Sequence, residues 1–152
     1  MGVLANETVN FTALLTFEVT GDEYCINNSL VLSIIKPDKI CNISSHNSKY
    51  SLLRTESIFI PLIDLKKIFH GEEQKTTSHT RVIIIEYKET QFGLLVEKVN
   101  EIIALDSDSL RTSGKFIFED NALYYADGTL KLANKELLFL NIEKIIKDID
   151  YF

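Results

Sequence analysis

Residues 57–69, with the sequence SIFIPLIDLKKIF, form the stretch from which the fold can be inferred. They are typical of a strand that breaks at Pro61 and turns into a short helix at Asp64, because proline lacks an amide donor and aspartate is a good helix N-cap. Residues 136–146, ELLFLNIEKII, have the same pattern, with Asn141 at the position of Asp64. We therefore expect each half of the chain to end in a short helix, one after Asp64 and one after Asn141.

An earlier pair of segments is also similar. Residues 14–35 (LLTFEVTGDEYCINNSLVLSII) align with residues 83–103 (IIIEYKETQFGLLVEKVNEII) when Tyr24 is placed on Phe92. The offset is 92 − 24 = 68 here and 141 − 64 = 77 at the helices, so one insertion of 77 − 68 = 9 residues reconciles the two. Such self-similarity predicts an internal duplication, although two β-rich halves can also resemble each other by chance.

Each half is predicted to be mainly β. Residues 14–26 and 81–96 are each expected to form a hairpin, with turns at residues 21–23 and near 88–90, since β-branched and aromatic residues dominate both segments. Few, short strands per unit favour two small closed barrels over one flat sheet, with each helix plugging a barrel end. The first unit is expected at residues 14–70 and the second at 80–150. The loop at 70–79 would link the barrels, and residues 1–13 would be an N-terminal tail.

The composition is typical of a globular protein that is soluble in water. The 152 residues fit one domain or two very small ones. They are 45% hydrophobic and 25% charged, with a net charge of −6, which argues mildly against nucleic acid as a partner. No segment approaches the ~20 apolar residues of a membrane span, and the N-terminus has no secretory pattern, so we expect a cytoplasmic location. Two cysteines, Cys25 and Cys41, cannot build a disulfide framework.

No set of catalytic or cofactor-binding residues is recognisable. The glycine motifs that bind nucleotide phosphates and the common hydrolase motifs do not occur. His70 and His79 have no cysteine nearby and do not have zinc spacing, and the pair Asp106 and Asp108 lacks the glycine and glutamate of a calcium loop. Cys25 is interpreted as a small core residue. We therefore expect no enzymatic activity, no cofactor and no metal site.

Several motifs together resemble the CheW-like domain of bacterial chemotaxis. The most specific are IPLIDLKKIF (60–69), which is similar to a "vPviDLr" box of the family, and FGLLVEKVNEII (92–103), which is similar to its "vGllVDsVseVi" box. The segments LLTFEVTGDEYCI, TRVIIIEY and LLFLNIEKIIKD fall in the family order around them, so the resemblance covers residues 14–148. It implies two five-stranded SH3-like barrels.

The resemblance also implies a non-enzymatic adaptor. Proteins of this family couple the cytoplasmic tips of chemoreceptors to the regulatory domain of a CheA-type histidine kinase, with kinase and adaptor joined barrel to barrel and receptor helices in the groove between barrels. Arg54 matches the arginine of the family's "NLRG" motif. The resemblance further implies partner contacts at four apolar positions, Val31, Ile34, Val82 and Val99. Each of these can equally be a core residue, whereas for Arg54 a surface salt bridge is the less favoured alternative.

The chain departs from the family pattern around Arg54. Where the family has "GviNLRG", residues 49–55 read KYSLLRT, so both glycines and the asparagine are replaced. Loss of glycine reshapes a loop that needs positive φ, which opens the alternative of a divergent paralogue that serves a different receptor, or a kinase outside motility. A second alternative is a double barrel that binds a small ligand between its units, although no base-stacking or phosphate-binding motif supports it. A third is a regulatory module whose partner kinase lacks such a domain of its own.

Overall fold

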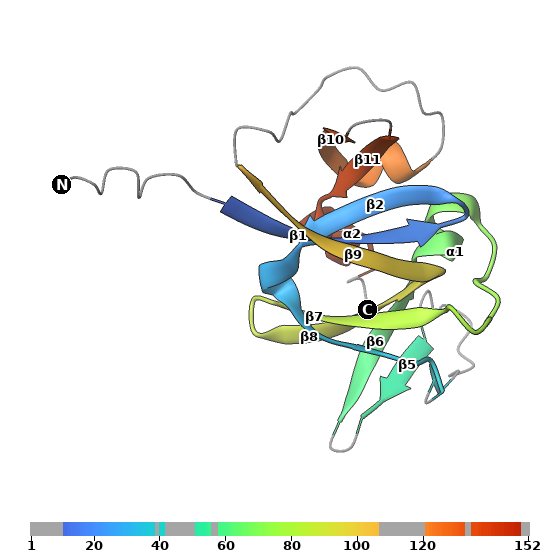
Figure 1. Cartoon of the computed structure of the whole chain (residues 1–152). Coiled ribbons are helices and arrows are strands. Elements are labelled where there is room, and N and C mark those ends of the chain that lie inside the picture. Colours follow the sequence, from blue (N-terminus) through green and yellow to red (C-terminus); the bar gives the residue numbers. More distant parts are fainter. Residues whose placement is uncertain are drawn as a thin grey trace.

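The computed structural model describes residues 11–38, 40–41, 51–55, 58–106, 121–132 and 135–149. Within these ranges the chain is mainly β, with two sheets and two short α-helices (Figure 1). The helices are α1 (Leu65–His70) and α2 (Ile142–Ile149), and two 3-10 turns are η2 (Asn28–Leu30) and η4 (Asn121–Tyr125). The strands are β1 (Phe11–Val19), β2 (Asp22–Asn27), β3 (Val31–Ile35), β4 (Ile40–Cys41), β5 (Ser51–Arg54), β6 (Phe59–Asp64), β7 (Arg81–Tyr87), β8 (Thr90–Val96), β9 (Lys98–Asp106), β10 (Ala126–Leu132) and β11 (Lys135–Leu140).

The two sheets do not follow the two halves of the sequence. The five-stranded sheet has the order β10-β11-β2-β1-β9, and the six-stranded sheet has the order β3-β7-β8-β6-β5-β4. Each sheet therefore takes one hairpin from one half and its other strands from the opposite half. The expectation of one barrel per half is wrong. The loop at 70–79 joins α1 to β7, and β6 and β7 on either side of it lie in the same sheet.

The strand pairings repeat at the two offsets found in the sequence. In the hairpin of β1 and β2, Phe17 pairs with Tyr24; 68 residues later, Ile85 pairs with Phe92 in the hairpin of β7 and β8. The strands that pair with these hairpins are related by the same offset of 68 residues. Leu15 pairs with Ile102 across β1 and β9, as Ile83 pairs with Ile34 across β7 and β3. At the offset of 77, the pairing of β10 with β11 repeats that of β5 with β6.

The six-stranded sheet is strongly curled. It has 6 − 1 = 5 strand spacings, which would separate β3 from β4 by about 24 Å if the sheet were flat. However, β3 ends at Ile35 and β4 begins at Ile40, 40 − 35 = 5 residues later, and five residues reach at most about 18 Å. The first and last strands must therefore approach each other.

Two expectations about residues 57–69 had different outcomes. The expected helix after Asp64 is confirmed as α1, and that after Asn141 as α2. The expected break at Pro61 is wrong, because β6 continues through it. At Pro61 the strand pairs with Leu52 of β5, and its pairing with β8 begins only at Leu62, so the missing amide of proline removes no bond to β8.

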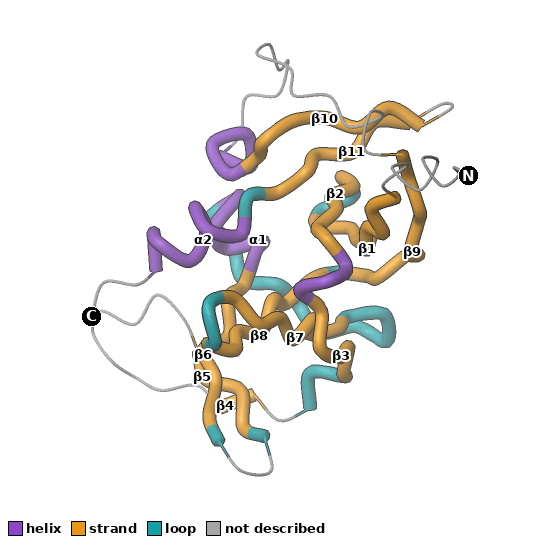
Figure 2. The backbone as a smooth tube through the Cα atoms, turned by 90° about the vertical axis from the view of Figure 1, so that its left-hand side faces the viewer, coloured by secondary structure: helices purple, strands orange, loops and turns teal. Residues whose placement is uncertain are grey.

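The main hydrophobic core lies between the two sheets. It contains side chains from β1 and β2, from β6, β7, β8 and β11, and from both helices, and its largest fully buried members include Phe17, Tyr24 and Phe69. The helices contribute Leu65 and Phe69 from α1, and Ile142, Ile145 and Ile146 from α2. They therefore cover the core that the sheets share (Figure 2) rather than plugging the end of one barrel. Two smaller clusters lie within the individual sheets.

Candidate functional site

The edge strands β3 and β9 present apolar side chains at the rim of the shared core. Val31 of β3 and Val99 of β9 are half-buried and pack against that core from equivalent positions, 99 − 31 = 68 residues apart. Ile34 and Ile102 are the next equivalent pair, and their side chains are 40% and 58% exposed. Each is paired with a buried core residue of the neighbouring strand, so the exposed surface is continuous with the core. Ile102 was not singled out by the sequence reasoning above.

The other two expected contact residues differ in accessibility. Arg54 is exposed at the end of β5, where it pairs across the strands with Phe59 of β6. Val82 is 0% exposed and belongs to the cluster inside the six-stranded sheet, together with Leu53, Leu62 and other side chains. Val82 therefore belongs to the core rather than to a contact surface, because β7 is buried on both faces from Val82 to Ile85.

A β-bulge lies at the same place in both sheets. In the five-stranded sheet the pairing of β1 with β9 shifts so that Asn100 is the extra residue, and in the six-stranded sheet the pairing of β3 with β7 shifts at Leu32. The two bulge residues are 100 − 32 = 68 residues apart. A bulge leaves its extra residue unpaired and re-aims its side chain. Leu32 is 50% exposed.

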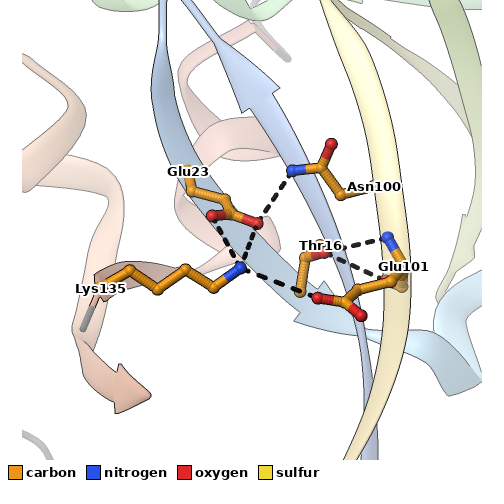
Figure 3. A network of polar contacts seen from close by, with 5 residues as sticks. All are labelled: Thr16, Glu23, Asn100, Glu101 and Lys135. Atoms are coloured by element: carbon orange, nitrogen blue, oxygen red, sulfur yellow. Dashed lines mark hydrogen bonds and ion pairs between the residues drawn. The ribbon is translucent and has the colours of Figure 1, made fainter. Parts of the chain in front are cut away.

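The bulge of the five-stranded sheet belongs to a polar network (Figure 3). The amide of Asn100 donates to Glu23 Oε2 at 2.9 Å, and Lys135 Nζ lies 3.2 Å from Glu23 Oε1 and 3.7 Å from Glu101 Oε2. The hydroxyl of the fully buried Thr16 donates to the Glu101 carbonyl and accepts from the Glu101 amide, both at 3.1 Å. These contacts connect side chains of β11, β2, β1 and β9, so four strands of the five-stranded sheet are linked at this end.

The equivalent end of the six-stranded sheet is apolar. The counterparts of Asn100 and Lys135 are Leu32 and Ile58, at 100 − 68 and 135 − 77. Ile58 is 48% exposed, and its neighbour Phe59 is 57% exposed. The alternating strand pattern in the sequence could have indicated Phe59. It could not have indicated Leu32, because its exposure depends on the bulge.

The titratable groups give no sign of a catalytic centre within the described ranges. Burial, with a smaller effect from Glu23, raises the pKa of Cys25 to about 12, so the thiol stays protonated at neutral pH and behaves as a core residue. No group of three or more histidine, cysteine or acidic side chains that could hold a metal is found among the described residues. His46, Cys41's side chain and Asp108 lie outside that description.

Comparison with known protein families identifies the family to which the chain belongs. The family model described as "CheW-like domain" matches residues 13–150. The chain belongs to the CheW-like domain family. This confirms the resemblance drawn from the two boxes at residues 60–69 and 92–103, and the match extends over nearly the whole chain.

Relatives in this family are named chemotaxis proteins. The chemotaxis protein CheW of Bacillus subtilis is 26% identical over 110 residues, covering 70% of this chain and 69% of the relative. That of Klebsiella aerogenes is 25% identical over 144 residues, covering 94% and 86%. The crystal structure of the scaffolding protein TtCheW from Thermoanaerobacter tengcongensis superposes with a TM-score of 0.73 at 22% identity, covering 85% of this chain and 83% of that one. This last likeness establishes a common fold.

The described helices are short. None of them is long and apolar enough to cross a membrane.

Proposed function

We propose that the protein is a non-enzymatic scaffold that couples chemoreceptor tips to a CheA-type histidine kinase in the bacterial cytoplasm. Support comes from the family model over residues 13–150 and from two relatives named chemotaxis protein CheW. Two partners would be bound, the regulatory domain of the kinase and the helical cytoplasmic tip of the receptor. The composition, which is acidic and poor in catalytic motifs, fits a binding protein.

We further propose that the two sheets are SH3-like barrels related by an internal duplication with exchanged strands. The repeated registers at offsets 68 and 77 support a duplication. The short link from Ile35 to Ile40 and the ion pair from Lys135 to Glu101 support the curvature that a barrel needs. On this proposal the repeat units stay at residues 14–70 and 80–150, although each barrel is built from both.

The single observation that carries the proposed receptor contact is the exposed pair Ile34 and Ile102. They occupy equivalent positions on two edge strands, at the rim of the core that the sheets share. An amphipathic receptor helix would bury its apolar stripe against them, with Val31 and Val99 below. Full burial of one such side chain is worth about 1.5–3 kcal/mol. The exposed Arg54 would supply several donors to a polar partner group.

The test is titration calorimetry of the full chain against two probes. These are the isolated regulatory domain of the CheA-type kinase and a coiled-coil peptide carrying the receptor tip, both from the source organism. We expect both to bind, and Ile34→Glu and Ile102→Glu each to weaken receptor binding by about 30-fold or more, as for interface hot spots. Tyr124→Glu, at an equally exposed aromatic residue on η4, is the matched control and should bind as the unmodified chain does.

The variant Arg54→Ala tests which of the two partners Arg54 contacts. Weaker binding of only one probe places Arg54 at that partner's contact. If neither probe binds a well-folded chain, the coupling function is rejected for these partners, and the divergent sequence KYSLLRT becomes the reason to test kinases outside motility. If both bind but the two isoleucine variants behave as the unmodified chain, the receptor contact lies elsewhere.

A further inference from the structure

The last four elements of the described chain are bonded to one another. We call η4, β10, β11 and α2 the C-terminal unit. Within it, β10 pairs with β11 along its length. The Asn141 amide, just before α2, donates to the Tyr125 carbonyl of η4 at 2.7 Å, and the Tyr125 hydroxyl donates to Asp148 of α2. The two strands, the helix and the 3-10 turn therefore form one internally bonded piece.

The backbone pairing between the C-terminal unit and the other described strands is short. β10 and β11 lie at one edge of the five-stranded sheet, with β11 next to β2 (Figure 2). β11 pairs with β2 in parallel at Leu138 with Tyr24 and at Phe139 with Cys25, whereas β1 pairs with β2 along the whole strand. If the unit moved away, β2, β1 and β9 would keep their pairings, and so would the six-stranded sheet.

Side chains attach the C-terminal unit to the rest of the molecule. Lys135 at the start of β11 forms ion pairs with Glu23 of β2 and Glu101 of β9 (Figure 3). Glu143 of α2 accepts from the Tyr87 hydroxyl of β7. Apolar side chains of the unit also pack into the shared core. The attachment therefore depends on side-chain burial and on these polar contacts more than on strand pairing.

We propose that the C-terminal unit is a lid, latched by Lys135, that opens as one piece while the rest of the fold stays intact. Proteins commonly open in such contiguous cooperative units, at a lower free energy than global unfolding. Opening would turn β2 into a sheet edge with unpaired backbone groups, to which another strand can add. The inference does not depend on the proposed coupling function, because opening is a property of the chain alone.

Cys25 lies beneath this lid. Its side chain is 0% exposed, in a buried cluster with Leu14 of β1 and with Leu130 and Leu137 of the C-terminal unit. Departure of the unit would remove both of these leucines together with the paired strand β11, and would uncover the thiol. A buried thiol is inert, so the rate at which Cys25 reacts with a thiol reagent measures the fraction of molecules that are open.

The experiment measures the labelling of Cys25 in the full chain by an aromatic disulfide. Cys41→Ser leaves Cys25 as the single thiol and is the background for every variant. Lys135→Met keeps the aliphatic stem but removes both ion pairs, and it should raise the labelling rate about 3-fold. Lys131→Met removes the same charge from an exposed position on β10. It is the matched control and should leave the rate unchanged.

Tyr87→Phe tests whether the lid opens as one piece. It removes the hydroxyl that holds Glu143 of α2, on an element other than the strand that covers Cys25. If α2 and β11 open together, this variant should also raise the labelling rate of Cys25 about 3-fold or more. An unchanged rate would show that β11 opens without α2, and an unchanged rate in Lys135→Met would show that Lys135 is no latch. Either result overturns the proposal.

Variants in the six-stranded sheet separate lid opening from global unfolding. Val82 and Ile60 are buried in the cluster inside that sheet, whose described members include none from the C-terminal unit. Val82→Ala and the milder Ile60→Val should increase the globally unfolded fraction, measured in urea, without changing the labelling rate of Cys25. If either folded variant accelerates labelling by the same factor as it increases the unfolded fraction, Cys25 is exposed by global unfolding and the lid is overturned.

Discussion

Asp64 and Asn141 cap the two helices in the same way. The Asp64 carboxylate accepts from the Lys67 amide at 3.2 Å, and the Asn141 side-chain oxygen accepts from the Lys144 amide at 3.0 Å. Each acceptor therefore satisfies the amide three residues later, at the start of a helix that covers the shared core. Each cap also makes a second bond: the other Asp64 oxygen accepts from the part-buried Gln74 amide at 2.8 Å and so fixes the loop before β7, whereas the Asn141 side-chain amide donates to Asp127 Oδ1 at 2.9 Å at an exposed site.

The caps predict unequal losses of stability. Asn141→Ala should lower the free energy of unfolding by about 1 kcal/mol, the usual value for an N-cap. Asp64→Ala should lower it by about 2 kcal/mol, because a part-buried loop amide also loses its acceptor. Urea unfolding at pH 7 measures both. Asp64→Asn, which keeps one acceptor oxygen, should fall between Asp64→Ala and the unmodified chain, and equal losses for both alanine variants would contradict the role of Gln74.

Gly93 predicts a packing defect. A Cβ added at Gly93 would lie 2.9 Å from Val82 Cγ1 and 3.2 Å from Leu62 Cδ1, both inside the six-stranded sheet. Gly93→Ala should therefore lower the free energy of unfolding by about 1–3 kcal/mol, as overpacking generally does. In a Val82→Ala background the same change should be less harmful, because the nearer methyl is gone. A double-mutant cycle in urea measures this coupling, and simple additivity would show that Val82 moves aside without loss.

The side chain of Thr16 is expected to stabilise the bulge in β9. Its buried hydroxyl bonds both backbone groups of Glu101, so Thr16→Val should leave the Glu101 amide unsatisfied and lower stability by about 1–3 kcal/mol. Hydrogen exchange at that amide should also become faster. Thr16→Ser keeps the hydroxyl and is the control. An unchanged exchange rate in Thr16→Val would mean that strand pairing alone holds the bulge.

Glu143 predicts a dependence of stability on pH. The Tyr87 hydroxyl, followed by Lys147, lowers the pKa of Glu143 from 4.5 to about 2. A carboxyl group with a lowered folded-state pKa stabilises the fold above its unfolded pKa and loses that contribution as the pH falls towards the folded value. The difference in urea midpoint between the unmodified chain and Glu143→Gln should therefore have its maximum value above pH 4.5 and should disappear as the pH falls to about 2.

Tyr87→Phe is the control for this pH dependence. It removes the hydroxyl that donates to Glu143, so it should abolish most of the pH-dependent difference while keeping the ring. A difference that persists unchanged to pH 2 would show that the Tyr87–Glu143 bond does not couple proton binding to folding.

The sequence predicted the local pairing and missed the long-range pairing. Aligning Tyr24 with Phe92 placed both hairpins in the correct register relative to each other, because alternation along a strand and the turn that follows are local properties. The partner of β11 is a different matter. Leu138 pairs with Tyr24 of the other half, and nothing within either segment specifies that choice, which depends on packing across the shared core.

The residues of the candidate contact surface could be predicted only in part from the sequence. Val31, Ile34 and Val99 were identified through the family resemblance and lie at the rim of the shared core. For Val82 the alternative of a core residue holds, since both faces of β7 are buried from Val82 to Ile85. Leu32 was missed because a bulge changes the direction of one side chain without changing the composition of the strand.

The interleaving of strands has a consequence for any shortened form of the protein. A chain cut within residues 70–79 would release a first fragment in which β1 and β2 have lost their neighbours β9 and β11, and a second in which β7 and β8 have lost β3 and β6. Neither fragment can complete a sheet alone, because exposed backbone groups at those edges would lack partners. The two fragments can regain a native fold only by associating with each other, as a swapped pair of half-molecules would.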